Sequence, residues 1–118
     1  MVGRSHHRDD RRRAVVRPHQ GEIWWAEAED KRRPVLVVTR NDAIDLLNRI
    51  IVAPVTRTIR NIPTEIRLGN DQGLSVDCVA SFDNLQPIRR SFLTERAGRL
   101  LIDQSTEICR AISALTDC

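Results

Sequence analysis

Two apolar segments, each with a polar residue near one end, constrain the fold of this chain most. They are Lys31–Thr39 (KRRPVLVVT) and Ile51–Thr58 (IVAPVTRT). The first contains a β-branched run with the length of a core strand, and Pro34 keeps the preceding Arg33 out of the helical conformation. Two stiff neighbouring strands can hold the guanidinium of Arg33 and the hydroxyl of Thr56 at fixed positions on one rim of a small barrel. Such a rim is suited to binding a phosphate.

The chain has 118 residues, enough for one hydrophobic core but not for two. No segment approaches the length of a transmembrane helix, and none has the pattern of a signal peptide, so the expected location is the cytoplasm. The three cysteines, Cys78, Cys109 and Cys118, lack metal-ligand or redox spacing and predict reduced thiols.

The sequence divides near residue 20 into a basic extension and a body. Residues 1–19 contain six arginines and two aspartates, a charge of +4, so the remainder of a chain with net charge +3 sums to −1. The extension lacks hydrophobic periodicity and is expected to be disordered, either as a basic arm for RNA or as a dispensable segment. It holds all three histidines, which argues strongly against a two-histidine acid–base nuclease or a histidine-rich metal centre in the body at 20–118.

The body reads as mainly β, with short connections and a helix at its end. A helical turn is expected at 43–47, capped by Asn41 or Asp42, and an amphipathic helix is expected at 104–115, capped by Asp103. Alternation directs Trp24 and Trp25 to opposite faces of the first strand, so one of them belongs in the core. The expected strands are 22–26, 31–39, 49–56, 63–68 (an edge strand), 75–82, 86–89 and 94–100. About five to seven short strands followed by one helix describe a small, partly closed barrel.

Four sequence blocks then suggest a family. They are GEIWWA at 21–26, KRRPVLVV at 31–38, VAPVT at 52–56, and VDCV at 76–79 ahead of DNL at 83–85. In order and spacing they resemble the MazF/PemK toxins, which are endoribonucleases of bacterial toxin–antitoxin pairs, over roughly residues 20–116. The resemblance implies an SH3-like barrel, a two-fold homodimer with an RNA groove across it, and no metal or other cofactor. It also implies cleavage of single-stranded RNA that leaves a 2′,3′-cyclic or 3′-phosphate and a 5′-hydroxyl.

By position, Arg33 matches the family's active-site arginine and Thr56 its active-site hydroxyl. Arg33 can stabilise a dianionic phosphorane through bidentate hydrogen bonds, and Thr56 can bind a non-bridging oxygen or orient the 2′-hydroxyl. A guanidinium stays protonated at ordinary pH, so the general base is left open. Glu29 and Asp30, in a turn shorter than that of many relatives, are candidate bases or orienting groups.

Further polar residues beside these segments are candidate RNA contacts, and Asp83-Asn84-Leu85 stands where relatives often have Asp-Gln-Ile. Simpler interpretations remain open: Arg33 can form a rim ion pair with Glu29 or Asp30, and Thr56 can satisfy a backbone group. No metal site is expected. The candidate RNA contacts are Lys31, Arg32, Arg57, Thr58, Arg60, Asp83 and Asn84.

The expected partners are single-stranded RNA (mRNA, tRNA or rRNA), a second copy of the chain, and a cognate antitoxin whose disordered segment folds along the RNA groove. Two other classes remain open. One is a gyrase-poisoning toxin of the same barrel that binds a protein and cuts nothing; the other is a catalytically inactive RNA-binding module.

Overall fold

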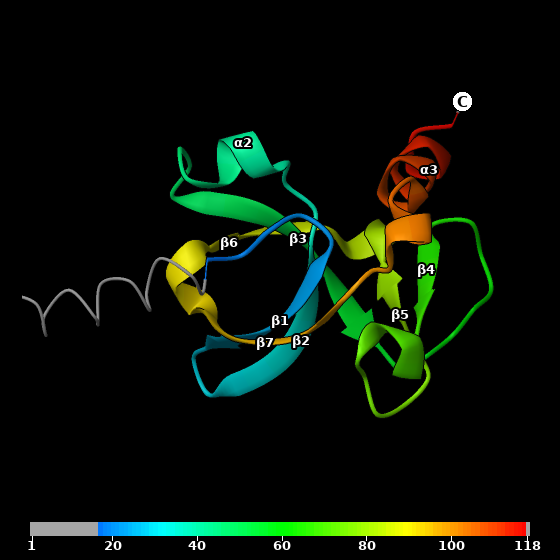
Figure 1. The fold of residues 1–118 in the computed structure, drawn as a ribbon, viewed down its shortest axis with the longest axis horizontal. Helices are drawn as coiled ribbons and strands as arrows, with labels where there is room; N and C mark the ends of the chain where they lie inside the picture. Colours follow the sequence, from blue (N-terminus) through cyan, green and yellow to red (C-terminus); the bar gives the residue numbers. More distant parts are fainter. Residues whose placement is uncertain (1–16, 118) are drawn as a thin grey trace, which may run out of the picture.

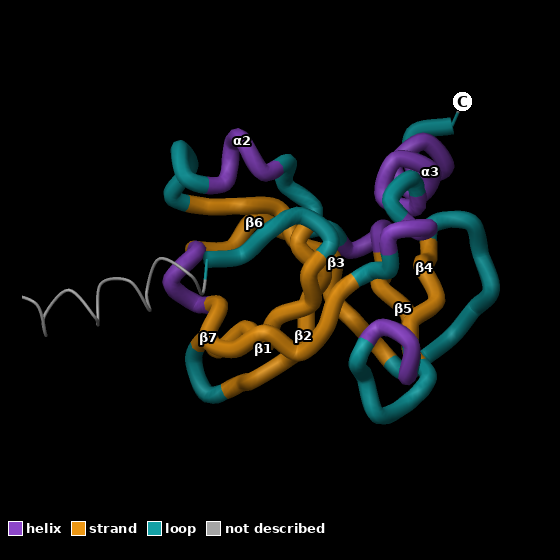
Figure 2. The backbone as a smooth tube through the Cα atoms, viewed as in Figure 1, coloured by secondary structure: helices purple, strands orange, loops and turns teal. Residues whose placement is uncertain are grey.

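The computed structural model describes residues 17–117, which form an antiparallel sheet curled part of the way into a barrel (Figures 1 and 2). The mainly β, partly closed barrel predicted from the sequence is confirmed. The expectations for residues 1–16 lie outside the described residues. The strands are β1 (Glu22–Ala28), β2 (Lys31–Val37), β3 (Arg49–Thr56), β4 (Glu65–Leu68), β5 (Cys78–Ser81), β6 (Gln86–Arg89) and β7 (Leu93–Arg99); the helices are α2 (Asn41–Ile44) and α3 (Glu107–Leu115).

The sheet order is β4-β5-β3-β2-β1-β7, and β6 pairs with β3 outside this path. The strand β3 therefore joins two parts of the molecule. Its residues 49–52 pair with β6, its residues 52–54 pair with β2, and at its end Val55 and Thr56 pair with Ala80 and Val79 of β5. In Figure 1 the part formed by β4, β5 and α3 lies beside the curl formed by β1, β2, β3, β6 and β7. Thr56 thus lies where the two parts meet.

Both faces of the central strands are buried, which explains the continuous apolar run in β2. Leu36 packs in a core cluster with Phe82, which follows β5, and with Ile108 of α3. The neighbouring Val35 points to the other face, where it packs with Trp24. The expectation of one core tryptophan is confirmed, because Trp24 is buried whereas Trp25 is partly exposed.

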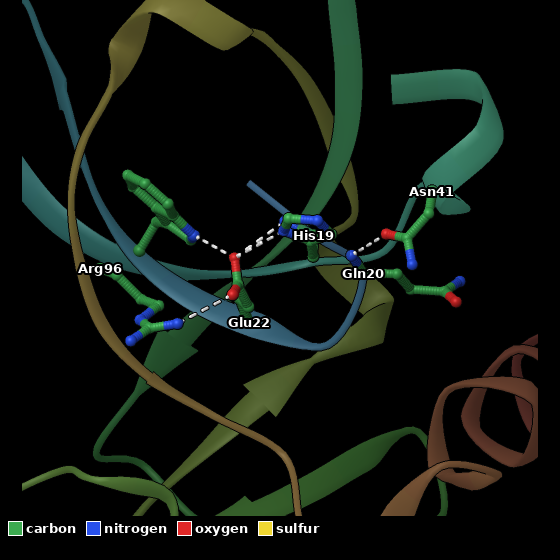
Figure 3. A network of polar contacts seen from close by, with 6 residues as sticks. His19, Gln20, Glu22, Asn41 and Arg96 are labelled. Atoms are coloured by element: carbon green, nitrogen blue, oxygen red, sulfur yellow. Dashed lines mark hydrogen bonds and ion pairs between the residues drawn. The ribbon is translucent and has the colours of Figure 1, made fainter. Parts of the chain in front are cut away.

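A polar network fastens the residues before β1 to the sheet (Figure 3). The carboxylate of Glu22 accepts hydrogen bonds from the Trp24 indole at 2.9 Å and from the backbone N–H of His19 at 2.8 Å. Its second oxygen lies 3.1 Å from the guanidinium of Arg96 in β7. Within residues 17–117 no helix is long and apolar enough to cross a membrane.

The predicted start and cap of the C-terminal helix are wrong. The helix α3 begins at Glu107, and Asp103 lies in a separate 3₁₀ turn, Ile102–Gln104. The side chain of Gln104 accepts the backbone N–H of Leu101 at 2.9 Å, and this bond closes the turn ahead of the helix. Thr106 occupies the N-cap position without a side-chain hydrogen bond.

Two other predicted boundaries are also wrong. The strand expected at 75–82 is confined to Cys78–Ser81, because its partner β4 ends at Leu68 opposite Cys78, so residues 75–77 have no strand to pair with. The helical turn expected at 43–47 is Asn41–Ile44. Asn41 does not cap it, because its side-chain oxygen accepts the backbone N–H of Gln20 at 2.6 Å.

Candidate active site

Arg33 and Thr56 line the same open hollow, of about 880 Å³, on the surface of the sheet. The β2–β3 register sets Val35 opposite Pro54. Continued by two residues, the same register would set Arg33 opposite Thr56. The loop after β3 and the turn after β5 form the other walls. Seven residues predicted for the site line this hollow: Arg33, Thr56, Arg57, Thr58, Arg60, Asp83 and Asn84.

The other four predicted residues do not line this hollow. Glu29 and Asp30 form the exposed two-residue turn of the β1–β2 hairpin, where Glu29 has a φ of 56°. No ion pair joins Arg33 to either carboxylate in the part of the chain that the structure describes, so the rim ion pair considered above is absent. Lys31 is exposed at the start of β2, and Arg32 lines a second hollow.

The hollow carries an excess of positive charge. Three arginines, Arg33, Arg57 and Arg60, line it, and Asp83 is the one carboxylate on its wall among residues 17–117. None of the three guanidinium groups forms an ion pair with a carboxylate of the described residues. Asp83 is itself held by the hydroxyl of Thr64, which donates to its Oδ2 at 2.7 Å. Unpaired guanidinium groups on one wall attract an anion with bidentate acceptors, such as a phosphate.

Among the described residues the hydroxyl of Thr56 has one hydrogen bond, in which its oxygen is the acceptor. Its oxygen accepts the backbone N–H of Thr58 at 3.2 Å. Since a hydroxyl also carries one donor hydrogen, this contact orients the group without using its proton. The predicted alternative, in which the hydroxyl satisfies a backbone group, is therefore compatible with donation to a ligand.

The buried carboxylate of Glu65, which the sequence analysis did not single out, fastens the loop of the hollow. Glu65 is 6% exposed, and its Oε1 accepts the backbone N–H groups of Arg60 at 3.0 Å and Asn61 at 3.1 Å. Its Oε2 is buried and has no hydrogen-bond partner among residues 17–117. Arg67 adds a second tie, donating to the side chain of Asn61 at 3.2 Å. The sequence carried one signal of this role: Glu65 stands beside apolar residues in a short segment that was predicted as an edge strand.

A second hollow, of about 600 Å³, shares Thr56 and Arg57 with the first. Its β2 arginine, Arg32, differs from Arg33 in having partners within the protein. The guanidinium of Arg32 lies 4.4 Å from the centroid of the Trp25 ring. It is also paired with Glu27 at 3.1 Å and with Glu95 at 2.7 Å. Two carboxylates and an aromatic face thus satisfy Arg32 within the protein.

The pKa of Glu27 is lowered by the hydrogen bond from the Thr94 hydroxyl, and further by Arg32. Its carboxylate is therefore charged across the neutral range. In the described part of the chain, no group of three or more histidine, cysteine or carboxylate side chains is arranged to hold a metal ion.

The sequence and the fold both match known proteins. Residues 19–116 match the family described as the PemK-like, MazF-like toxin of type II toxin–antitoxin system. The chain is 38% identical over 104 residues to the probable endoribonuclease MazF5 of Mycobacterium tuberculosis (strain ATCC 25618 / H37Rv), a match that covers 86% of this chain and 94% of that protein. It is 38% identical over 88 residues to endoribonuclease MazF3 of M. tuberculosis (strain CDC 1551 / Oshkosh), covering 75% and 85% of the two chains.

Solved structures agree with these matches. The M. tuberculosis toxin MazF-mt6 superposes with a TM-score of 0.72 at 35% identity, covering 80% of this chain and 95% of that chain. An endoribonuclease from Mycobacterial species, solved in complex with its cognate antitoxin, has a TM-score of 0.73 at 22% identity, covering 86% and 97%. This second match shows a shared fold.

Proposed function

The chain belongs to the PemK-like, MazF-like toxins of type II toxin–antitoxin systems, and on this premise we propose that it is an endoribonuclease whose active centre is the hollow lined by Arg33 and Thr56. One observation carries the proposal: seven residues picked from separate segments of the sequence line one hollow with three guanidinium groups and one carboxylate. The backbone of RNA carries a negative charge at every phosphate and is complementary to this wall.

The proposed reaction is attack of a ribose 2′-hydroxyl on the adjacent phosphorus, which expels the 5′-oxygen of the next nucleotide. It leaves a 2′,3′-cyclic phosphate, or a 3′-phosphate after hydrolysis, and a 5′-hydroxyl. The phosphorane that forms carries more negative charge than the substrate. Arg33 is proposed to stabilise this charge through two parallel hydrogen bonds. In a desolvated site these bonds would lower the activation free energy by about 2–4 kcal/mol.

Thr56 is proposed to orient the same phosphate. Its oxygen accepts the N–H of Thr58, so its O–H can donate to a non-bridging phosphate oxygen or to the attacking 2′-oxygen. Arg57, Thr58, Arg60 and Asn84 are proposed as contacts to the flanking RNA.

We assign the proton acceptor to Asp83 in preference to Glu29 or Asp30. Asp83 lines the hollow, whereas the two turn carboxylates do not. The Thr64 hydroxyl fixes one carboxylate oxygen and leaves the other available. An Asp83→Asn variant that cleaves RNA at the parental rate would contradict this assignment.

The remaining expectations are part of the same proposal. The protein is proposed to act in the cytoplasm as a homodimer on mRNA, tRNA or rRNA, and to be inhibited by a cognate antitoxin. The fold shared with an endoribonuclease solved with its cognate antitoxin supports such a partner. Co-purification of the chain with the product of a neighbouring gene tests this part.

The test is incubation of the purified protein with a synthetic RNA pool in EDTA, followed by analysis of the new ends. Cyclic or 3′-phosphate ends with 5′-hydroxyl partners are expected, and Arg33→Ala should produce them far more slowly. If parent and Arg33→Ala are equally toxic and neither cleaves RNA, the protein-binding toxin replaces this proposal.

A further inference from the structure

We propose that Arg49, Arg89 and Arg90 form a second phosphate-binding site, which holds the RNA strand at the end of the β3–β6 ladder opposite to the active centre. The inference rests on the proposed ribonuclease function and assigns a binding site to residues outside the hollow of Arg33.

The first observation is a pair of like charges placed directly opposite each other. The β3–β6 register sets Arg49 against Arg89, and both side chains are exposed. Like charges in this relation destabilise a sheet. Neither guanidinium pairs with a carboxylate within residues 17–117. The molecule therefore keeps an unfavourable pair of charges that an anion would stabilise.

The second observation is a third arginine with an unsatisfied donor beside this pair. The Nε of Arg90 is buried and has no hydrogen-bond partner among the described residues. Its Nη1 lies 3.7 Å from Asp45, a carboxylate that Arg17 already contacts at 2.6 Å. An open hollow of about 610 Å³ is lined by these three arginines together with Asn48 and Ser91, and no carboxylate of residues 17–117 lies on its wall.

The strand geometry links this cluster to the active centre. From Arg49 to Thr56, β3 advances seven residues, or about 23 Å at the usual rise per residue. On the antiparallel β6, Gln86 lines the active hollow and Arg89 lines the arginine cluster. The two cationic hollows therefore lie at the two ends of one pair of strands, which run side by side in Figure 1.

The surface between the hollows is apolar. Ile51 is 37% exposed and lies opposite the exposed Pro87. Alternation along β3 puts this pair on the same face as Arg49, Arg89 and Val55, which lines the active hollow, whereas Thr56 at the end of the strand points to the other face. Phosphate contacts at both ends with apolar contact between them fit an extended single strand, whose bases can lie on the middle of the ladder. Arginine forks bind phosphate and carboxylate groups alike, so the choice of RNA over an acidic peptide follows from the proposed ribonuclease function.

The test compares two RNAs that carry the same cleavage sequence. That sequence is first mapped with the synthetic RNA pool described above. The short RNA spans only the active hollow, and the long RNA extends by several nucleotides on both sides. The variants are Arg49→Ala, Arg89→Ala and their double mutant. Arg99→Ala is the matched control, because it removes the same charge from an exposed arginine of β7 outside the ladder.

The Arg49 and Arg89 variants are expected to raise KM for the long RNA about three- to tenfold while leaving kcat and the short RNA unchanged. For binding of the long RNA, the slope of log K against log salt should fall by about 0.7 for each phosphate contact removed. Removing one arginine of a like-charged pair should not lower the Tm, so unfolding does not confound the result.

The inference is overturned if the variants affect short and long RNA equally, if Arg99→Ala has the same effect, or if they weaken only an acidic protein partner or a second copy of the chain. If the parent cleaves neither RNA, the proposed function fails on its own. Binding of the long RNA then still decides the arginine cluster: weaker binding by the two variants supports it, and unchanged binding overturns it.

Discussion

Arg32 and Arg33 are neighbours in the chain, yet they lie in different hollows on the two sides of Thr56. The alternation of a β-strand sends adjacent side chains to opposite faces. On one side, Arg32 meets Glu27 of β1, Glu95 of β7 and the ring of Trp25. On the other side, Arg33 meets no carboxylate partner within the described residues and shares its hollow with two further arginines.

The comparison teaches that a binding wall differs from a structural one in whether its guanidinium groups are already paired within the protein, and not in the number of arginines. Both hollows contain a guanidinium of β2. In the second hollow the protein itself supplies the counter-charges, so that Arg32 of β2 contacts both β1 and β7. In the first hollow Asp83 is the one carboxylate of residues 17–117 on a wall with three arginines, so most of the counter-charge has to come from a ligand. Thr56 and Arg57 border both, so variants on the two sides can be compared directly.

The largest expected effect is the difference between the two neighbouring arginines. Arg33→Ala should lower the cleavage rate about 10²- to 10³-fold, because it removes the proposed donors to the phosphorane. Arg32→Ala should change the rate by less than about fivefold, since exposed ion pairs contribute little. Single-turnover cleavage of one RNA by both variants measures this. Equal losses would mean that the two hollows do not differ in function.

Thr56 tests whether the side that contains Arg33 is the reactive one. Thr56→Val removes the donor hydrogen and should lower the cleavage rate about 10- to 100-fold, the range of a hydrogen bond to a charged group. Thr56→Ser keeps the hydroxyl and should cleave within a few-fold of the parent. The same kinetic assay measures both variants. A slow Ser variant would indicate that the methyl group, and with it the packing of the shared wall, matters more than the hydroxyl.

Much of the first hollow could be predicted because its signals are local. Pro34 fixes the strand conformation of Arg33, and the VAPVT block carries Thr56 at the end of the next strand. Hence the fold class and the residues that line the hollow followed from short patterns and a family resemblance. The assignment of Asp103 as a helix cap was local as well, but it failed because the Gln104 side chain closes a 3₁₀ turn there instead.

The second hollow could not be predicted because its decisive contacts are distant in sequence. Glu95 lies 63 residues from Arg32, and nothing near Arg32 in the chain indicates that β7 will bring a carboxylate to it. Local patterns therefore predicted Arg32 as an RNA contact beside the catalytic Arg33. The role of Glu65 escaped for a related reason, since its partners are backbone N–H groups of a loop, and such partners leave no pattern of side chains.

Glu65 should affect the first hollow and spare the second. Glu65→Ala leaves two backbone N–H groups without their acceptor and should destabilise the fold by about 2–4 kcal/mol, while the loosened loop raises KM. Glu65→Gln keeps an acceptor oxygen and should fall between this variant and the parent. Denaturant unfolding and RNA kinetics measure the two effects. The tryptophan emission, to which Trp25 of the second hollow and the buried Trp24 both contribute, should stay unchanged, and a shift would show that the change extends beyond the first hollow.

The smallest effect concerns Glu27, and it tests whether the second hollow is held by charge. The hydrogen bond from Thr94 and the charge of Arg32 lower the pKa of Glu27 below its ordinary value of 4.5. A lowered folded-state pKa adds stability above the unfolded-state pKa, and this stability is lost as the pH falls through the folded-state pKa. The parent should therefore melt slightly above Glu27→Gln near neutral pH, and the difference should vanish in acid. Thermal melts of both proteins from about pH 7 to about pH 3 measure it. A difference in Tm that does not change with pH would mean that Glu27 stabilises the protein through packing. The second hollow would then not be held by charge.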